Sequence, residues 1–415
     1  MATDMRHPSL SASDAFVNDK WNMTVSELLL DYLKLEGVDT IFGIPGGAVI
    51  YIADELKKRR DEFNFVICRQ ETGAAYIAHG YSIVSDTLGV VLTTSGPAAT
   101  NAITGSMNAQ AAGAALLTIT GECAEASFGK GYLQEGIDSM LDVSNVYKNA
   151  VKSSSVITGQ ENFQTLVQQA LRNARSQPAN AAHLSIPNNV SGECIKLQGA
   201  FDEHGNKVPF PVSPNAYRVD NTSTDVAKAV ATLDDILAAD RPLLFLGNGA
   251  RKALSDERRR HRLMAFCHKF AVPVMTTPDG KGIYPETDEM SLRNYGMVAC
   301  TWPAKYMGPN DTVENGKDVP GPGHFDVLAV FGSALGELAT SVVATDHWSK
   351  MLLPTKSFTQ VDLNQGMIAR DYPVTRGIVG DVGATLDAML DAAEHREPGH
   401  GTDERRDIIA EIKAD

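Results

Sequence analysis

The sequence predicts an α/β protein made of two domains, each a doubly wound and mostly parallel sheet. Short apolar runs of strand length alternate with helical patterns along the chain, which is typical of βαβ units. The 35 glycines and only 7% aromatic residues favour many tight strand-to-helix turns. A chain of 415 residues is also too long for one ordinary core, since domains have roughly 150 residues.

The first domain is predicted at residues 22–191, after a polar and flexible lead-in at residues 1–21. Thr24 and Glu27 form a capping box that starts a helix, and Gly37 ends it. Apolar runs predict buried strands at 63–68, 88–94, 115–120 and 182–187. Helical spacing predicts helices near 48–60, 71–85, 97–110 and 161–175.

Residues 192–222 are rich in Pro, Gly and Asn without a sustained period, and they predict a linker. The second domain is predicted at residues 223–393. It begins with a helix near 223–239 and continues with strands at 241–247, 272–277, 325–332 and 358–362. Residues 394–415 are highly charged and predict a solvated tail.

The charge balance of 37 Lys and Arg against 51 Asp and Glu gives −14. This argues against nucleic acid and against an anionic membrane as partners. The five scattered cysteines form no CxxC pair and predict reduced thiols in a cytoplasmic protein. No apolar run reaches the roughly 18 residues of a membrane span, and the N-terminus lacks the pattern of a signal peptide.

Glu71 is the most suggestive single residue for chemistry. It follows the apolar run 63–68 at a strand-to-helix turn, so its carboxyl group is expected at the carboxyl edge of the sheet. It could hold or move a proton there, or it could only complement the charge of a helix N-terminus. The segment 95–101 also opens a helix at a strand end, which favours a ligand-facing loop.

The run 247–252 gives a second, weaker signal. Gly247, Gly249 and Arg251 follow a strand and precede a helix, where backbone amides could meet a phosphate. The GxGxxG match is incomplete, so a tight strand-to-helix turn is the alternative interpretation. The histidines have no metal-ligand spacing, and no metal ligand is predicted in this chain.

Several runs together resemble the thiamine-diphosphate enzymes of the acetolactate synthase type. They occur in the family's order at residues 36–47, 69–82, 93–105, 116–122 and 132–138, and in the second half at 241–252, 272–286 and 361–381. The resemblance covers residues 22–393. It implies that the first domain binds the aminopyrimidine ring of the cofactor and that the second is the family's central domain.

The resemblance also implies roles for individual residues. Glu71 matches the glutamate that holds a proton at N1′ of the aminopyrimidine, and Gln134 matches an active-site glutamine that contacts the substrate or the reacting intermediate. The cofactor-binding positions that it implies are Ile44, Pro45, Gly46, Gly47, Glu71, Ser95, Gly96 and Asn101. The cofactor supplies the reactive carbon for chemistry on a 2-oxo acid.

Some positions depart from the family pattern. Gln70, Ile44, Ala98, Leu133 and His79 replace its usual residues, which puts the substrate rather than the cofactor in doubt. The family's central domain carries FAD, but the arginine expected before the last strand of the first domain is missing, with Gln177 near its place. In the central domain itself, residues 332–338 replace another motif. The resemblance therefore leaves open whether this domain binds FAD, ADP or nothing.

The family's GDG…NN motif, which holds Mg2+ and the diphosphate, is not found in these residues. The expectation is therefore a split enzyme, in which a separate, smaller chain carries that motif, and the simplest assembly is a heterotetramer of two plus two chains. The expected reaction is decarboxylation of a 2-oxo acid, carboligation, or both. The alternatives are a non-catalytic regulatory or binding protein with the same fold, and a nucleotide-binding dehydrogenase.

Overall fold

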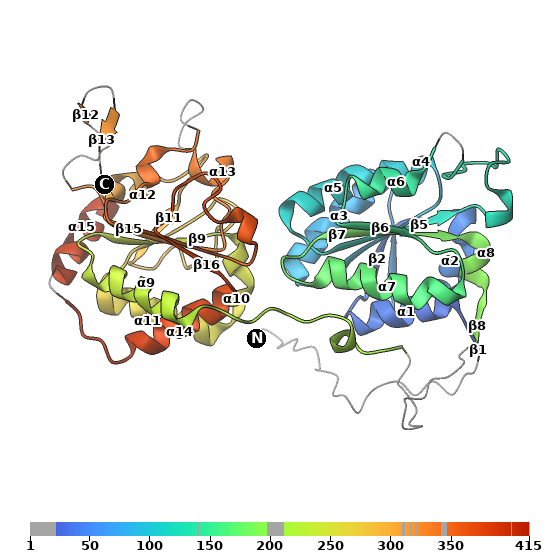
Figure 1. Cartoon of the computed structure of the whole chain (residues 1–415), viewed down its shortest axis with the longest axis horizontal. Coiled ribbons are helices and arrows are strands. Elements are labelled where there is room, and N and C mark those ends of the chain that lie inside the picture. The colour runs from blue at the N-terminus through green and yellow to red at the C-terminus, as the bar shows by residue number, and fades with distance from the viewer. Residues whose placement is uncertain are drawn as a thin grey trace. The chain divides into compact units, whose positions relative to one another are not determined.

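The computed structural model describes residues 22–138, 141–196, 211–308, 312–314, 317–319, 323–341, 347–399 and 401–414. The chain forms two compact units, Met1–Asp220 and Asn221–Asp415, each with a six-stranded sheet (Figure 1). Every pair of neighbouring strands in both sheets is parallel. The predicted fold of two parallel-sheet α/β domains is confirmed. The predicted lead-in, residues 1–21, lies outside the described residues.

The sheet of the first unit has the order β3-β2-β4-β5-β7-β6. Its strands are β2 Thr40–Ile44, β3 Asn64–Ile67, β4 Gly89–Thr93, β5 Leu116–Glu122, β6 Ser153–Val156 and β7 Ala181–Pro187. Strands β4, β5 and β7 are buried along their whole length, which explains their continuous apolar runs. Strand β6, which reads Ser-Ser-Ser-Val, has no such run and was not predicted.

Helices cover both faces of this sheet (Figure 1). One face carries α1 Val25–Leu35, α2 Ile50–Lys58, α7 Gln160–Arg175 and α8 Asn188–Gly192. The other carries α3 Glu71–Ser85, α4 Pro97–Asn101, α5 Ile103–Ala112 and α6 Val143–Lys148. The predicted capping box is present, because the Thr24 side chain accepts from Glu27 N and the Glu27 carboxylate accepts from Thr24 N.

One polar side chain, His183 on β7, lies fully inside the first unit. Its ring nitrogens lie 3.0 Å from Thr120 Oγ1 and 2.7 Å from Ser154 Oγ, and its ring stacks on Tyr147 at 3.8 Å. Burial lowers the pKa of His183 to about 3, so the ring is neutral at neutral pH. The hydroxyl partners satisfy the ring and let the core accept a histidine.

Part of the segment predicted as a linker belongs to the first unit. Strand β8 Cys194–Lys196 pairs antiparallel with β1 Asn22–Thr24. Farther along, the Tyr217 hydroxyl donates to Glu36 Oε1 at 2.6 Å, and Arg218 Nη2 lies 3.3 Å from Glu36 Oε2. These contacts fix the end of the segment to α1, while residues 197–210 lie outside the described residues.

The sheet of the second unit has the order β11-β10-β9-β14-β15-β16. Numbered within the unit this is 3-2-1-4-5-6, the order of dinucleotide-binding sheets. Its strands are β9 Pro242–Leu246, β10 Val274–Thr276, β11 Ser291–Asn294, β14 Val327–Phe331, β15 Ser357–Asp362 and β16 Arg376–Val379. A small antiparallel pair, β12 Thr312–Glu314 and β13 Lys317–Val319, stands outside this sheet.

Helices lie on both faces of this sheet as well (Figure 1). Helices α9 Val226–Ala238, α11 Glu257–Phe270 and α14 Val382–Ala393 cover one face. Helix α12 Trp302–Met307 and the short α13 Glu337–Thr340 lie on the other. The short helix α10 Arg251–Ser255 follows β9 through a 3-10 turn, Asn248–Ala250.

The prediction of a solvated tail is wrong for residues 402–414. They form helix α15 Thr402–Ala414, whose Arg405, Ile409 and Ile412 are buried. Arg405 donates to three backbone carbonyls, those of Ala239, Phe270 and Ala271. The charged sequence hid a narrow buried stripe, because most of its residues lie on the exposed side of the helix.

Within the described residues, no helix combines the length and the apolar character needed to cross a membrane.

Candidate functional site

The predicted site segments of the first unit meet at the carboxyl edge of its sheet. Strand β2 continues through α2 to β3 on one side, whereas β4 continues through α4 and α5 to β5 on the other. Where neighbouring strands lead away in opposite directions, a doubly wound sheet leaves a ligand-binding crevice. Ile44 ends β2 and residues 45–47 follow it, while residues 95–96 follow β4, so both predicted loops flank this switch point.

Glu71 is the first residue of α3, directly after the edge strand β3 and its turn. Asn101 Nδ2 donates to Glu71 Oε2 at 3.0 Å, and Thr72 Oγ1 donates to the Asn101 carbonyl at 2.6 Å. The helices can approach closely because Gly105 lies against Ala75, where an added Cβ would come within 2.5 Å of the Ala75 Cβ. Two residues that are 30 positions apart are thus brought into direct contact.

Only one carboxylate oxygen of Glu71 is used in this contact. Among the described residues, Oε1 accepts no hydrogen bond, and the side chain is only half-buried. A carboxyl group held at one oxygen and available at the other fits a ring nitrogen that carries a proton. These residues therefore fit the aminopyrimidine end of thiamine diphosphate.

The loop after β2 is held from two sides. Gly46 lies against Thr94, since an added Cβ would stand 2.6 Å from the Thr94 Cβ, so a larger residue would push the two loops apart. Asn188 Nδ2 donates to the Gly47 carbonyl at 2.7 Å. Gly47 itself has open space where a side chain would stand. Ile44 and Pro45 precede these glycines at the end of β2, half-buried and exposed respectively.

Gln134 is brought to the loop after β4. Gly96 has a φ of 57°, and a Cβ there would lie 2.6 Å from the Gln134 carbonyl oxygen. Gln134 also adopts a positive φ of 58° and is exposed, while Ser95 beside Gly96 is buried. Gly96 is thus required twice, for its own backbone conformation and for the close approach of Gln134.

Two carboxylates that were not predicted as site residues hold the segment around Gln134. Glu135 accepts from the backbone amides of Gly129, Gly131 and Tyr132, the latter two at 3.0 and 3.1 Å. Glu122, buried at the end of β5, accepts from Gly136 N at 3.0 Å and Cys123 N at 2.9 Å. Burial raises the pKa of Glu122, which these amides partly oppose. The sequence signal that could have identified Glu122 is its position at the end of an apolar run of strand length.

In the second unit, Gly247 and Gly249 serve close contact between two loops. Gly247 N donates to the Phe331 carbonyl and Gly249 N donates to the Gly332 carbonyl, both at 2.9 Å. A Cβ on Gly247 would lie 2.3 Å from Gly332 O. Arg251 donates to Asn248 Oδ1 at 3.0 Å and to the Asp279 carbonyl at 2.8 Å. These pairings match the alternative interpretation, a tight turn, and nucleotide binding there stays a prediction.

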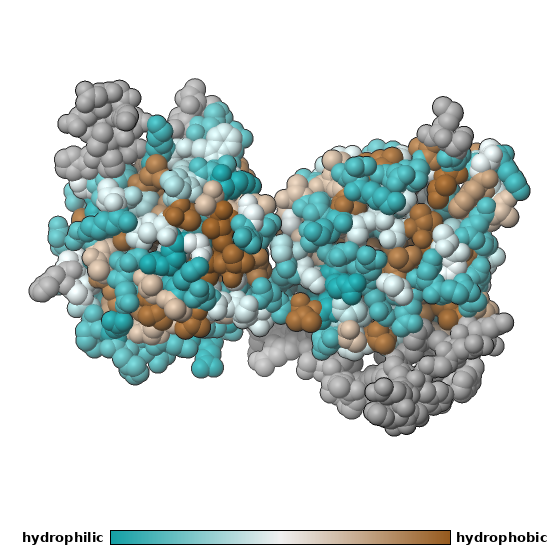
Figure 2. All heavy atoms as spheres, viewed as in Figure 1, coloured by the Kyte–Doolittle hydropathy of each residue, from teal (hydrophilic) through white to brown (hydrophobic). Residues whose placement is uncertain are grey.

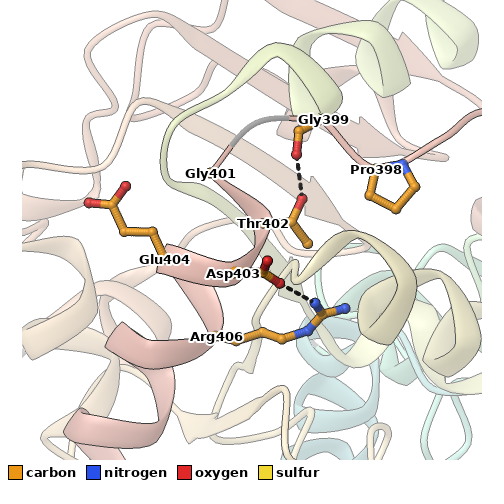
Figure 3. Close-up of a pocket in the computed structure, with 7 residues that line it drawn as sticks. All are labelled: Pro398, Gly399, Gly401, Thr402, Asp403, Glu404 and Arg406. Carbon is orange, nitrogen blue, oxygen red and sulfur yellow. Dashed lines mark hydrogen bonds and ion pairs between the residues drawn. The ribbon is translucent and has the colours of Figure 1, made fainter.

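A pocket of about 530 Å3 lies at the start of α15 (Figure 3). Its lining consists of Pro398, Gly399, Gly401, Thr402, Asp403, Glu404 and Arg406. Arg406 pairs with Asp403 at 3.0 Å, which leaves an acidic surface that does not suit a phosphate or a 2-oxo acid. The pocket lies in the second unit, whereas Glu71 lies in the first. The described residues contain no cluster of three or more His, Cys, Asp or Glu that could hold a metal ion.

Comparison with known proteins identifies the class. Residues 23–141 match the family model "Thiamine pyrophosphate enzyme, N-terminal TPP binding domain", and residues 228–314 match "Thiamine pyrophosphate enzyme, central domain". One model matches the part of the first unit that holds Glu71, Asn101 and Gln134, and the other lies within the second unit. Both units of the chain thus match domains of the thiamine pyrophosphate enzymes, as its resemblance predicted.

Its relatives include large subunits of acetolactate synthases. The chain is 28% identical to the acetolactate synthase large subunit of Parasynechococcus marenigrum over 89% of its own length and 54% of that protein. It is 26% identical to the one from Haemophilus influenzae, over 88% and 57%. It is 27% identical to the acetolactate synthase isozyme 3 large subunit of Escherichia coli, over 94% and 61%. The chain thus spans little more than half the length of these relatives.

Proposed function

We propose that this chain is a subunit of a thiamine-diphosphate enzyme that acts on a 2-oxo acid by decarboxylation, carboligation or both. In this proposal it contributes the pyrimidine-binding side of the active site and a central domain. A separate chain contributes the Mg2+ and diphosphate site, in an assembly of two plus two chains. The relatives named acetolactate synthase large subunit favour this reaction class.

The observation that carries the proposal is the contact between Glu71 and Asn101 at the carboxyl edge of the sheet. Asn101 fixes one carboxylate oxygen of Glu71 and leaves the other available. A lone carboxylate at a helix N-terminus would need no such partner, because the helix amides already favour its charge. The hydrogen bond from Asn101 therefore favours a Glu71 carboxyl group that is oriented toward a ligand over one that only complements the charge of the helix N-terminus.

Each residue then has a distinct task. Thiamine diphosphate supplies, when bound, a nucleophilic carbon and an acceptor for the electrons that decarboxylation releases. Glu71 would hold the proton at N1′, and Asn101 would keep the carboxyl group in line with that nitrogen. The loops at 44–47 and 95–96 would form the wall beside the ring, and Gln134 would contact the substrate.

A stripe along α3 supports a partner that covers this side of the site. Its members Gly73, Tyr76, Ile77, Gly80 and Val84 recur at helical spacing. Tyr76, Ile77 and Val84 are 43%, 49% and 89% exposed, and the two glycines have no neighbour within 4 Å of an added Cβ. Glycine inside an exposed helix destabilises the helix. A partner chain that packs closely against α3 would explain why glycines stand at these positions.

The surface seen in Figure 2 is of the ordinary mixed kind. On the face that Figure 2 shows, hydrophilic residues cover much of both units and hydrophobic ones form scattered patches. The net charge of −14 does not by itself attract an anionic substrate. Substrate attraction would then depend on the partner and on the bound metal and cofactor.

The test is to capture the tagged chain from its native extract and identify the partner by mass. The eluate is then assayed for pyruvate consumption with thiamine diphosphate and Mg2+. Val84→Asp on α3 should abolish partner capture, whereas Val219→Asp, at a site that is 83% exposed, should not. Capture of a stoichiometric chain with a GDG…NN segment, with cofactor-dependent turnover, is the expected result. No partner, together with no cofactor binding, would favour the non-catalytic alternative.

A further inference from the structure

The segment that carries Gln134 is held by carboxylates on both sides. Before Gln134, the Glu135 carboxylate gathers the amides of Gly129, Gly131 and Tyr132. After it, the buried Glu122 carboxylate holds the amide of Gly136. The residues between these two anchors form a tight loop, with Gln134 exposed near its tip.

This loop adopts a conformation that its sequence alone would not favour. Gln134 has a φ of 58°, in the left-handed region that residues with a side chain rarely occupy. Gly129 and Gly131 each have a φ of 72°, which lets the chain curl around the Glu135 carboxylate. A residue held at positive φ needs surrounding contacts that enforce it, and such residues cluster at functional sites.

Two contacts enforce this conformation. Three backbone amides donate hydrogen bonds to the Glu135 carboxylate. Because the acceptor is charged, these bonds are stronger than hydrogen bonds between neutral groups. Gly96 forms the other side, because the Gln134 carbonyl would lie only 2.6 Å from any Cβ at that position. The Glu135 carboxylate thus holds the loop in its curved conformation, and the missing side chain of Gly96 leaves room for the loop to pack against the end of β4.

We propose that Glu135 is a positioning residue for Gln134, acting by curling residues 129–132 into the loop that presents Gln134 at the carboxyl edge of the sheet. The proposal rests on the proposed function in one respect, namely that Gln134 contacts the substrate. Glu135 itself points into the backbone of its own loop and has no direct role in the reaction.

The first experiment measures amide hydrogen exchange in the peptide that covers residues 129–132. Glu135→Gln keeps the size of the side chain but removes its charge and one acceptor oxygen. Exchange in this peptide should become about tenfold faster, since hydrogen bonds to a charged group are lost. The matched control is Glu125→Gln, a change of the same kind in the same loop region at a side chain without a described contact. Unchanged exchange in Glu135→Gln, with the fold intact by circular dichroism, would overturn the proposal.

The second experiment is a double-mutant cycle in the assembled enzyme, with pyruvate as the probe substrate. Glu135→Gln should lower kcat/KM about tenfold or more when Gln134 is present, since small misplacements of an active-site group cost this much. In a Gln134→Ala background the same change should cost less than about twofold, because the group it positions is already gone. An equal loss in both backgrounds, or no loss in either, would contradict the proposal.

The two experiments separate this proposal from the proposed function. If the assembled enzyme with the unmodified chain shows no turnover that depends on thiamine diphosphate, the proposed function fails, while hydrogen exchange still decides whether Glu135 orders the loop. If Glu135→Gln fails to fold, Glu135→Asp takes its place. That side chain keeps its charge but is too short to reach all three amides, and it should give an intermediate exchange rate.

Discussion

Arg405 on α15 caps two helices of the second unit at once. Its guanidinium donates to the Ala239 carbonyl at the end of α9, and to the Phe270 and Ala271 carbonyls at the end of α11, at 2.8–3.2 Å. The last carbonyls of a helix have no partner within the helix, and these lie in a buried region. Arg405→Met keeps the apolar stem and removes all three donors.

The size of the effect follows from these contacts. A hydrogen bond to a charged group contributes about 1.5 kcal/mol at the low end, so three of them contribute about 4.5 kcal/mol. Burial lowers the pKa of Arg405, which indicates that burying its charge costs free energy. Removing the charge abolishes this desolvation cost and so offsets part of the lost hydrogen-bond energy. We expect the free energy of unfolding to fall by about 3 kcal/mol.

Urea denaturation, followed by circular dichroism, measures the loss. With a slope of about 2–3 kcal/mol per molar urea, the midpoint of the second unit should fall by about 1 M. Arg258→Met is the matched control, because Arg258 lies exposed on α11 and should change the midpoint by less than about 0.2 M. If Arg405→Met lowers the midpoint no more than this control does, Arg405 does not cap the two helices.

Three further predictions concern the first unit. Glu71→Gln should lower turnover of the assembled enzyme by a factor of about 10²–10⁴, as loss of a proton-transfer group does, whereas Glu161→Gln, in the first turn of α7, should leave it unchanged. Asn101→Ala should lower kcat by about tenfold, since one hydrogen bond to the Glu71 carboxylate is lost, and it should cost nothing further once Glu71 is Gln. His183 titrates near pH 3 in the folded chain and near 6.5 when unfolded, so only the unfolded chain gains its proton between these values. The free energy of unfolding should therefore fall by about 1.4 kcal/mol per pH unit below about pH 6.5, and His183→Asn should show a shallower fall in denaturation curves.

The sequence was sufficient to place much of the candidate site on one edge of the sheet. Strands β4, β5 and β7 are buried on both faces, so they read as continuous apolar runs. The residues after such runs then lie at the carboxyl edge by the geometry of a parallel sheet. The segment 95–101 was predicted there on this ground, and Glu71 was predicted there because it follows the apolar run 63–68, whose strand β3 is only partly buried. The roles assigned to Ile44–Gly47, Asn101 and Gln134 came from the family resemblance.

The contacts between these residues could not be predicted in the same way. The bond between Asn101 and Glu71 depends on how closely the end of α4 approaches the start of α3, and the contact between Gly96 and Gln134 depends on two positive φ angles. Glu135 lies next to Gln134 in the sequence, but nothing in its neighbours indicates three converging amides. Tertiary packing also decided α15, where four buried residues among many charged ones gave too weak a pattern.

The two glycine-rich turns show how the same signal can have two physical causes. In the first unit, Gly47 has open space where a side chain would be, and its loop follows β2 at the switch point. In the second unit, Gly247 and Gly249 contact the Gly332 loop at the corresponding switch point between β9 and β14, and the amide of Gly249 is paired there. A phosphate that bound at this turn would have to displace those backbone pairs. The strand order of the second unit therefore indicates a dinucleotide fold, while the packing of its turn opposes the use of that turn as a phosphate cradle.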